Sequence, residues 1–554
     1  MAATITLPYL TRIVIDEVLV AGRSSVLVPV LLAFLVVGVV RLVLAVTRRL
    51  IAGRVSLGVE VDLRARMFGH LQRLSVGYFD RMPVGQLMSR ATSDLQTVRF
   101  FLGYGLVFLF MNIFTVIAVT VLMLLIDARL ALVALAVGPG LMLIAWRYTK
   151  VSNPVFVDVQ QRVGEVTAMA EESISGIRVV KAFGQENPRA EGFGETATRA
   201  FDRSMDAAWI RASYQPLIGF LPVLGLAGVL IYGGILTIDG SLTLGEFVQF
   251  YLYLTFLVGP FRVFGTLLGS AQRAIAGGKR IFEVLDAQPD VKEPSHPRQL
   301  PAGGGGIRLE SVTFAYGDAE PVLSDVDLDV PAGTAVALIG PTGSGKTTLT
   351  NLLPRFTDPR VGRVLLDGVD VREFSLTDLR RSVAVVPQEP FLFSMSVSEN
   401  IAYGAPDATE DDVRAVARAA QADRFIDDLP KGFETVVGER GFTLSGGQRQ
   451  RIAIARAILA DPRVLVLDDA TASVDASTEA EIHDALRAAM RGRTTFVIAH
   501  RLSTLRLADE LVVLDEGRIV ARGTHEELYE TSATYREIHD YGLATPTSSE
   551  RVLR

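Results

Sequence analysis

The chain has 554 residues, of which 49% are hydrophobic and none is cysteine. Its 55 basic and 61 acidic side chains give a net charge of −6, which argues against a nucleic-acid-binding protein. The lack of cysteine excludes disulfides, thiolate nucleophiles, iron–sulfur clusters and cysteine-based zinc sites. The length predicts more than one domain.

Five apolar runs in the first half of the chain predict membrane-spanning helices. Such a helix needs about 20 mostly apolar residues to cross a hydrocarbon core of roughly 30 Å, whereas a buried soluble helix fits about 10–14. The runs cover residues 26–47, 100–126, 130–146, 212–238 and 243–268. Ahead of them, residues 4–20 predict an apolar helix that is too short to span and lacks the basic start of a signal peptide.

The charge of the connecting segments predicts the orientation in the membrane. Residues 48–99 contain nine Arg, and residues 147–211 contain nine Lys or Arg, whereas the connections on the other side are almost without basic residues. Basic segments stay on the cytoplasmic side. Because both segments are long and contain few helix breakers, we expect membrane helices that continue far into the cytoplasm.

Charged and aromatic residues within the apolar runs have two open interpretations. Arg41 and Arg262 lie toward the cytoplasmic ends, where a long side chain reaches the interface, although charges inside a membrane also mark substrate paths. The aromatic residues of the last run either line an apolar cavity or pack between helices. They are Phe247, Phe250, Tyr251, Tyr253 and Phe256.

The second half of the chain has a different pattern. Residues 286–306 are rich in Pro and Gly and predict a linker between domains. Beyond it, short apolar strands at residues 335–340, 383–387 and 464–468 alternate with helical stretches, which predicts an α/β domain. We therefore expect a membrane domain over 1–285, a linker over 286–306, an α/β domain over 307–540 and a tail over 541–554.

A phosphate-binding loop follows the first of these strands. The sequence GPTGSGKTT satisfies the P-loop pattern, with Lys346 expected at the β- and γ-phosphates and the Thr347 hydroxyl on Mg²⁺. The predicted nucleotide-binding residues are Gly340, Pro341, Thr342, Gly343, Ser344, Gly345, Lys346, Thr347 and Thr348. The strand at 464–468 ends in Asp468, the expected second ligand of Mg²⁺, followed by Asp469.

The sequence LSGGQRQR at residues 444–451 resembles the signature of ATP-binding cassette (ABC) transporters. Residues 78–94 and 172–186 resemble the cytoplasmic segments of exporter-type half-transporters. The resemblance implies an all-α membrane domain of six helices followed by a P-loop ATP-binding cassette. It also implies ATP and Mg²⁺ as cofactors, a multi-pass protein of the cytoplasmic membrane, and coupling elements near residues 78–85 and 172–183.

The resemblance assigns roles to further residues. Tyr316 corresponds to the aromatic residue that stacks on adenine, Gln388 to the glutamine that contacts Mg²⁺, and His500 to the histidine that contacts the γ-phosphate. Glu439 corresponds to a contact with the partner's cytoplasmic helices and Asp475 to a contact between the two cassettes. The signature residues Ser445, Gly446, Gly447 and Gln448 are expected to close on the partner's ATP.

One residue departs from the family pattern. Where the family's hydrolytic members place Glu after Asp468, this chain has Asp469, whose side chain is one methylene shorter. A catalytic group displaced by on the order of 1 Å can lose about a hundredfold in rate. The resemblance and this departure together predict a slow ATP site with Gln388, Asp469 and His500 as its catalytic residues, and a heterodimer in which the intact signature serves a partner's P-loop. The alternative left open is a homodimer in which Asp469 still supports hydrolysis after a small backbone adjustment.

The expected function is an exporter subunit that moves lipids, drugs or other amphipathic compounds. An importer with the exporter architecture and an ATP-gated regulator or channel subunit remain as alternatives. Because a half-transporter of this type has six spans, the five runs and the short first helix predict that about 20 residues or more of the first helix are missing.

Overall fold

The computed structural model describes residues 2–438, 441, 443–470, 476–499 and 501–543, and the chain divides into two compact units. The first contains Met1–Gln72 and Val84–Ala287. The second contains Gln288–Arg554 together with the short segment Arg73–Pro83. The predicted Glu439, Asp475 and His500 and most of the predicted tail lie outside the described residues.

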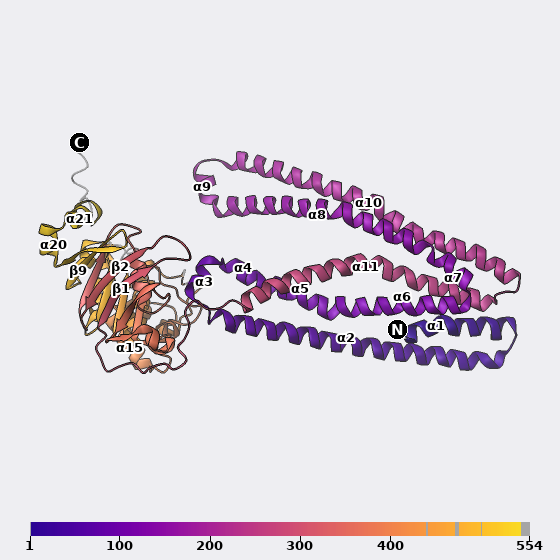
Figure 1. Ribbon diagram of the computed structural model, residues 1–554, viewed down its shortest axis with the longest axis horizontal. Coiled ribbons are helices and arrows are strands. Elements are labelled where there is room, and N and C mark those ends of the chain that lie inside the picture. The colour runs from indigo at the N-terminus through magenta and orange to yellow at the C-terminus, as the bar shows by residue number, and fades with distance from the viewer. Residues whose placement is uncertain (1, 439–440, 442, 471–475, 500, 544–554) are drawn as a thin grey trace. The chain divides into compact units, whose positions relative to one another are not determined.

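The first unit is built from long helices (Figure 1). The sequence begins with α1 (Ala2–Ile13) and a π-helical continuation, η1 (Val14–Val20), and the predicted extensions are present as α2 (Leu27–Leu71), α8 (Val137–Ser175) and α10 (Glu186–Ile238). The remaining helices are η2 (Ser24–Val26), α4 (Val84–Ser89), η3 (Arg90–Asp94), α5 (Leu95–Phe100), η4 (Phe101–Gly105), α6 (Leu106–Ile126), α7 (Ala128–Leu135), α9 (Ile177–Ala182) and α11 (Leu244–Leu285).

Four helical stretches in the described part of the chain are long and apolar enough to cross a membrane: Ser24–Leu71, Val84–Ile126, Ala128–Ser175 and Glu186–Ile238. They contain four of the predicted runs. The fifth run forms the first part of α11, where the side chains of five residues, Arg262 among them, lie outside the described set. Arg41 is exposed on α2, which is compatible with both of its interpretations.

A buried cluster joins α1, α6, α7, α10 and α11. Phe250 and Tyr253 are 0% and 1% exposed within it, and the Tyr253 hydroxyl donates a hydrogen bond of 3.0 Å to the carbonyl of Ile5. The close contact of Phe247 with Gly233 places another predicted aromatic residue between helices. For these three residues the structure favours packing over a cavity.

The second unit contains two sheets. A six-stranded sheet has the order β10-β9-β3-β8-β7-β6, in which only β10 is antiparallel to its neighbour, and a four-stranded antiparallel sheet has the order β2-β1-β4-β5. The strands are β1 (Ile307–Phe314), β2 (Leu323–Val330), β3 (Ala335–Ile339), β4 (Val361–Leu366), β5 (Val369–Asp370), β6 (Val383–Val386), β7 (Val464–Asp468), β8 (Thr494–Ile498), β9 (Glu510–Asp515) and β10 (Arg518–Gly523).

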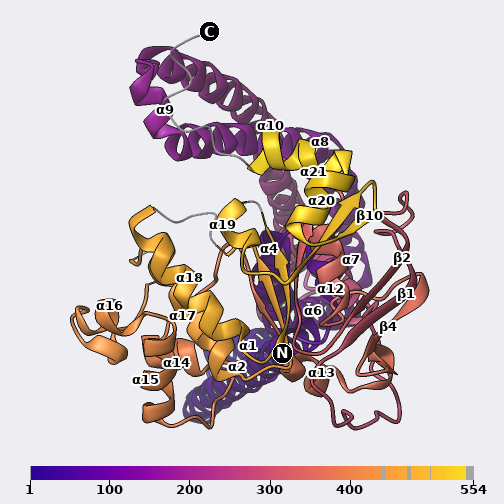
Figure 2. The same cartoon turned by 90° about the vertical axis from the view of Figure 1, so that its left-hand side faces the viewer.

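The parallel strands are apolar on both faces because both faces are covered. Along β3, Val336 and Leu338 pack toward the smaller sheet, whereas Ala337 and Ile339 pack toward a helical layer. Figure 2 shows the helical layer on one side of the six-stranded sheet and the smaller sheet on the other. The helices of the unit are α3 (Val76–Arg81), α12 (Lys346–Leu352), η5 (Val371–Glu373), α13 (Leu376–Ser382), α14 (Val397–Ala402), α15 (Glu410–Ala419), α16 (Asp423–Asp427), η6 (Gly432–Glu434), α17 (Gly446–Leu459), α18 (Ala476–Met490), α19 (Leu502–Leu505), α20 (His525–Thr531), α21 (Ala533–Glu537) and η8 (Ile538–Leu543).

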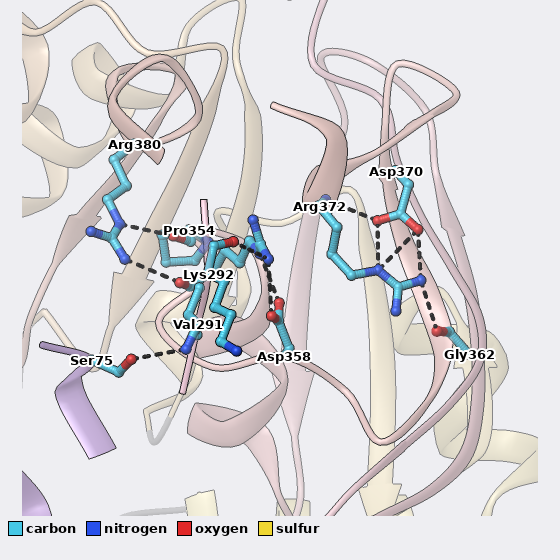
Figure 3. A network of polar contacts seen from close by, with 10 residues as sticks. Ser75, Val291, Lys292, Pro354, Asp358, Gly362, Asp370, Arg372 and Arg380 are labelled. Carbon is cyan, nitrogen blue, oxygen red and sulfur yellow. Dashed lines mark hydrogen bonds and ion pairs between the residues drawn. The ribbon is translucent and has the colours of Figure 1, made fainter. Parts of the chain in front are cut away.

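The start of the predicted linker is hydrogen-bonded to segment 73–83 (Figure 3). The backbone N–H of Val291 donates to the Ser75 hydroxyl at 2.9 Å, and Asp290 forms an ion pair of 2.9 Å with Arg81. Segment 73–83 and the linker therefore meet at one place on the α/β unit.

Arg355, just beyond α12, holds the next linker residue. Its Nη2 donates to the carbonyl of Lys292 at 2.9 Å, and its Nε and Nη2 donate to the Asp358 carboxylate at 2.8 and 3.0 Å. The residue is 4% exposed. The pKa of neighbouring Arg380 is lowered, mainly by burial and to a smaller extent by repulsion from the Arg355 guanidinium. Because Arg355 donates a hydrogen bond to Lys292, this part of the predicted linker is held against the α/β unit.

Replacing Arg355 with Met should destabilise the α/β unit by about 2 kcal/mol, because it breaks an ion pair whose arginine is buried and removes the donor to the Lys292 carbonyl. Calorimetric unfolding of the full-length protein measures this change. Arg308→Met is the matched control, since Arg308 pairs with Asp329 where both side chains are more than half exposed and should cost less than about 0.5 kcal/mol. Equal losses of unfolding free energy in the two variants would contradict a structural role for the contact between Arg355 and Lys292.

Candidate functional site

The predicted nucleotide-binding motifs follow neighbouring parallel strands. The P-loop follows β3, Asp468 and Asp469 stand at the end of β7, and Gln388 follows β6, while β8 lies between β3 and β7. Carboxyl ends of parallel strands meet at one edge of a sheet, and ligands bind there. The strand order therefore brings together motifs that are more than a hundred residues apart in sequence.

The P-loop has the backbone conformation that a phosphate cradle needs. Gly343 and Gly345 have φ angles of 87° and 99°, which favour glycine. A Cβ atom at Gly345 would lie 2.7 Å from a methyl group of Leu323, and one at Gly340 would collide with the carbonyl oxygen of Leu514. A side chain at either position would displace the loop. Because both residues are glycine, the loop keeps this conformation and its backbone N–H groups can approach a phosphate closely.

The side chain of Lys346 forms hydrogen bonds within the P-loop. Its Nζ donates to the carbonyls of Gly340 and Pro341 at 2.7 and 2.8 Å, and the residue is 6% exposed. Burial lowers its pKa, while the charge of Asp468 opposes that shift. A phosphate placed in the loop would supply the negative charge that this buried ammonium needs.

Two of the residues predicted to hold Mg²⁺ lie near Lys346, since the charge of Asp468 acts on its ammonium and Thr347 follows it in the chain. Thr347 is exposed beside buried Lys346 and Thr348, and Asp468 is half-buried at the end of β7. In the described ranges, no three or more His, Asp or Glu side chains form a group that would bind a metal alone. A magnesium ion here would therefore depend on the Thr347 hydroxyl, the Asp468 carboxylate and phosphate oxygens, which are the hard oxygen ligands that it prefers.

Asp469 and Gln388 are in contact. The Gln388 amide donates to the Asp469 carboxylate at 3.4 Å, at the long end of hydrogen bonding. Asp469 is 6% exposed and has a φ angle of 43°, in the left-handed region that Asp tolerates better than most residues with a side chain. Its short carboxylate is thus fixed at the end of β7, next to exposed Gln388.

Tyr316 lies beside the P-loop helix. Its hydroxyl is 3.2 Å from the Thr348 hydroxyl, its ring meets Phe314 edge-on at 4.8 Å, and 47% of the residue is exposed. An aromatic ring that is half open to solvent next to a phosphate loop can accept a planar base.

The signature residues form the start of α17. The Ser445 side chain accepts from the N–H of Gln448, and the Gln448 side chain accepts from the N–H of Ser445, which together form a capping box. Among the described residues, no hydrogen bond links the signature to the P-loop of the same chain. Ser445 remains exposed, so this helix start can face another molecule.

Neither the contacts of Arg355 nor the contact between Gln388 and Asp469 could be predicted from the sequence. Arg355 carries no motif, and its burial follows only from the packing of the linker. The Gln388 contact depends on β6 pairing with β7, which no local pattern specifies.

Comparisons with known proteins match both halves of the chain. Residues 2–261 match the family described as ABC transporter transmembrane region, and residues 323–472 match the family described as ABC transporter. The ATP-dependent lipid A-core flippase of Syntrophus aciditrophicus (strain SB) is 36% identical over 553 residues, which cover 100% of this chain and 92% of the flippase. The fatty acid ABC transporter ATP-binding/permease protein of Mycobacterium bovis is 39% identical over 478 residues, which cover 86% of this chain and 75% of that protein.

A solved structure is similar across both units. The structure of a bacterial Atm1-family ABC exporter with ATP bound matches with a TM-score of 0.81 and 29% identity, covering 97% of this chain and 96% of that chain. The predicted fold class, a helical membrane domain followed by an α/β ATP-binding domain, is confirmed. The helical domain spans a membrane several times and the ATP-binding domain is cytoplasmic. This chain is a member of the ABC transporter family, an exporter-type half-transporter that couples ATP hydrolysis to transport.

Proposed function

We propose that this half-transporter exports lipids or other amphipathic compounds as one half of a heterodimer, and that the ATP site built on its own P-loop is slow. Support for the substrate class comes from two relatives whose names specify a lipid A-core and a fatty acid. The observation that carries the slow site is Asp469, a short carboxylate held at the end of β7.

The proposed roles follow from the arrangement of the P-loop residues. The loop amides and Lys346 bind the phosphates, and Lys346 exchanges its bonds to the Gly340 and Pro341 carbonyls for phosphate oxygens. Tyr316 stacks on adenine. The assignment of adenine stacking rests on the exposed face of Tyr316 next to Thr348.

The water that attacks the γ-phosphate requires a carboxylate within hydrogen-bond reach. In the proposed site Asp469 takes this role, Asp468 and Thr347 hold Mg²⁺, and Gln388 contacts both Mg²⁺ and Asp469. A shorter carboxylate must approach the water by backbone movement, which makes hydrolysis slow while ATP binding is retained.

The partner is proposed from the same departure. Two copies of this chain would form two sites with Asp469, whereas its signature helix is complete from Ser445 to Gln448. A second half-transporter with Glu at the position of Asp469 would form one fast site against this signature. The two subunits would then have unequal ATP sites.

Transport assays test the proposed export. The chain and its partner half-transporter are reconstituted in phospholipid vesicles with the ATP-binding domains outward, and accumulation of a fluorescent fatty acid or lipid in the lumen or inner leaflet is followed. ATP-dependent inward movement, which corresponds to export from a cell, is expected. Movement in the opposite direction would indicate an importer, and ATP-dependent ionic current without uphill movement would indicate a channel or regulator. Either result contradicts the proposal.

A further inference from the structure

The membrane unit contains a basic groove between α2 and the segment from Arg99 to Phe108. Its volume is about 480 Å³, within the usual range of about 300–1,000 Å³ for ligand pockets. We call it the α2 groove. Its lining residues, all described, are Arg48, Arg49, Ala52, Gly53, Ser56, Leu57, Arg99, Phe100, Gly103, Tyr104, Val107 and Phe108, and none of them is acidic.

The positions of Arg48, Arg49 and Arg99 at the ends of apolar runs predict that the α2 groove lies at the depth of lipid head groups. Arg48 and Arg49 come directly after the apolar run of α2, and about 20 helical residues from Leu27 cover roughly 30 Å, the thickness of the hydrocarbon core. Arg99 directly precedes the uncharged run that begins at Phe100. Because basic residues flank the cytoplasmic ends of spans, the groove opens at the cytoplasmic leaflet.

The positive charge of the groove is only partly neutralised. Arg99 forms an ion pair of 3.1 Å with Glu60, which also pairs with Arg64 at 2.7 Å. The Arg48 guanidinium contacts the sulfur of Met111. Within the described part of the chain, no carboxylate pairs with Arg48 or Arg49. The groove therefore has two guanidinium groups available for an anion from outside.

One wall of the groove is a ladder of aromatic rings. Phe100 and Tyr104 have ring centroids 5.4 Å apart, and Tyr104 stacks on Phe108 at 4.5 Å. The three residues are spaced by one helical turn, so the ladder runs from the level of Arg99 into the apolar run. An apolar chain that enters beside the arginines would lie along these rings.

Two glycines shape the groove. A Cβ atom at Gly103 would lie 2.6 Å from the Ser56 hydroxyl, so the two helical segments touch at this position. Gly53 has open space around its missing Cβ. A larger side chain at Gly53 would fill the groove without disturbing the contact at Gly103.

We propose that the α2 groove binds the anionic head group, phosphate or carboxylate, of the amphiphile that this transporter moves, with the apolar chain along Phe100, Tyr104 and Phe108. Guanidinium groups bind both anions in a forked geometry, and basic pockets between membrane helices on the cytoplasmic side hold lipid head groups. The assignment of the bound amphiphile as cargo rests on the proposed export of amphipathic compounds.

Equilibrium binding of radiolabelled dodecyl phosphate to the full-length protein in an uncharged maltoside detergent tests the site. Arg49→Gln and Gly53→Phe should each weaken binding about tenfold or more, because one removes a charged hydrogen-bond donor and the other fills the groove. The matched controls are Arg54→Gln and Gly58→Phe, which change the same residue types on α2 outside the groove and should bind within about twofold of the original protein. Unchanged binding in Gly53→Phe, or equal losses in the controls, would overturn the site.

Transport kinetics separate cargo from a resident lipid. In phosphatidylcholine vesicles with and without phosphatidylglycerol, the groove variants should raise the KM for a fluorescent anionic amphiphile, whereas Arg54→Gln and Gly58→Phe should leave this KM unchanged. If these variants lose dodecyl phosphate binding but keep the transport KM, the groove holds a membrane lipid, and its assignment to cargo is overturned. If the original protein binds the probe through the groove but moves no amphiphile, the proposed export fails while the anion site stands.

Discussion

Replacing Lys346 with Met is expected to weaken ATP binding at this chain's own P-loop about 100-fold. The buried ammonium donates to two loop carbonyls and is the cation that we propose binds the phosphates. Hydrogen bonds to charged groups contribute about 1.5–3 kcal/mol, and roughly 2.7 kcal/mol corresponds to a factor of about 100. Equilibrium binding of a slowly hydrolysed ATP analogue with Mg²⁺ measures this loss.

Two further variants test whether the loss of ATP binding is specific to the ammonium group of Lys346. Lys346→Arg keeps the charge but should bind ATP nearly as weakly, because a planar guanidinium is larger than an ammonium and Lys346 is only 6% exposed. Lys431→Met removes an exposed lysine of the same unit and should bind ATP like the original protein. If Lys346→Met bound the analogue within twofold of the original, the P-loop would have to bind phosphate through its backbone alone.

Replacing Asp469 with Glu is expected to raise ATP hydrolysis by the chain purified alone at least about tenfold. The longer side chain brings the carboxylate closer to the attacking water, and a displacement of about 1 Å can change the rate about a hundredfold. We expect the lower part of this range because Asp469 has a φ angle of 43°, which is less favourable for Glu than for Asp. Phosphate release under saturating ATP measures the rate.

Asp469→Asn is the matched control, since Asn tolerates the left-handed backbone and retains the side-chain length but loses the carboxylate. It should fall below the original rate, which would show that the short carboxylate still acts. The slow-site proposal is wrong if the original chain already hydrolyses ATP as fast as Asp469→Glu. The same pair of variants, assembled with the partner half-transporter, reports how much the slow site contributes to the total rate.

The spans and the P-loop could be predicted because each depends on a local pattern. Hydrocarbon offers no hydrogen-bond partner, so a spanning segment must be a long apolar helix, and residues 100–126 carry that signal without help from neighbours. The P-loop likewise needs glycine where the backbone has a positive φ angle, as at Gly343 and Gly345. The roles assigned to individual site residues remain predictions.

Other features had no local signal. The five aromatic residues of the last run fit both packing and a cavity, and the burial of Phe250 and Tyr253 follows from contacts with α1 and its neighbours. The linker composition predicted a boundary, but its bonds to Ser75 and Arg355 join residues that are separated by more than sixty positions.

The sequence by itself determined that this protein spans a membrane, binds nucleotide phosphates and resembles an exporter half-transporter, because periodicity, composition and short motifs encode those properties. Only the tertiary structure decided that Gln388 contacts Asp469 and that Arg355 bonds the linker to the ATP-binding unit. It also decided that Arg48, Arg49 and Arg99 line one groove. These contacts depend on strand order and helix packing, which bring distant residues together and which no single segment of the chain specifies.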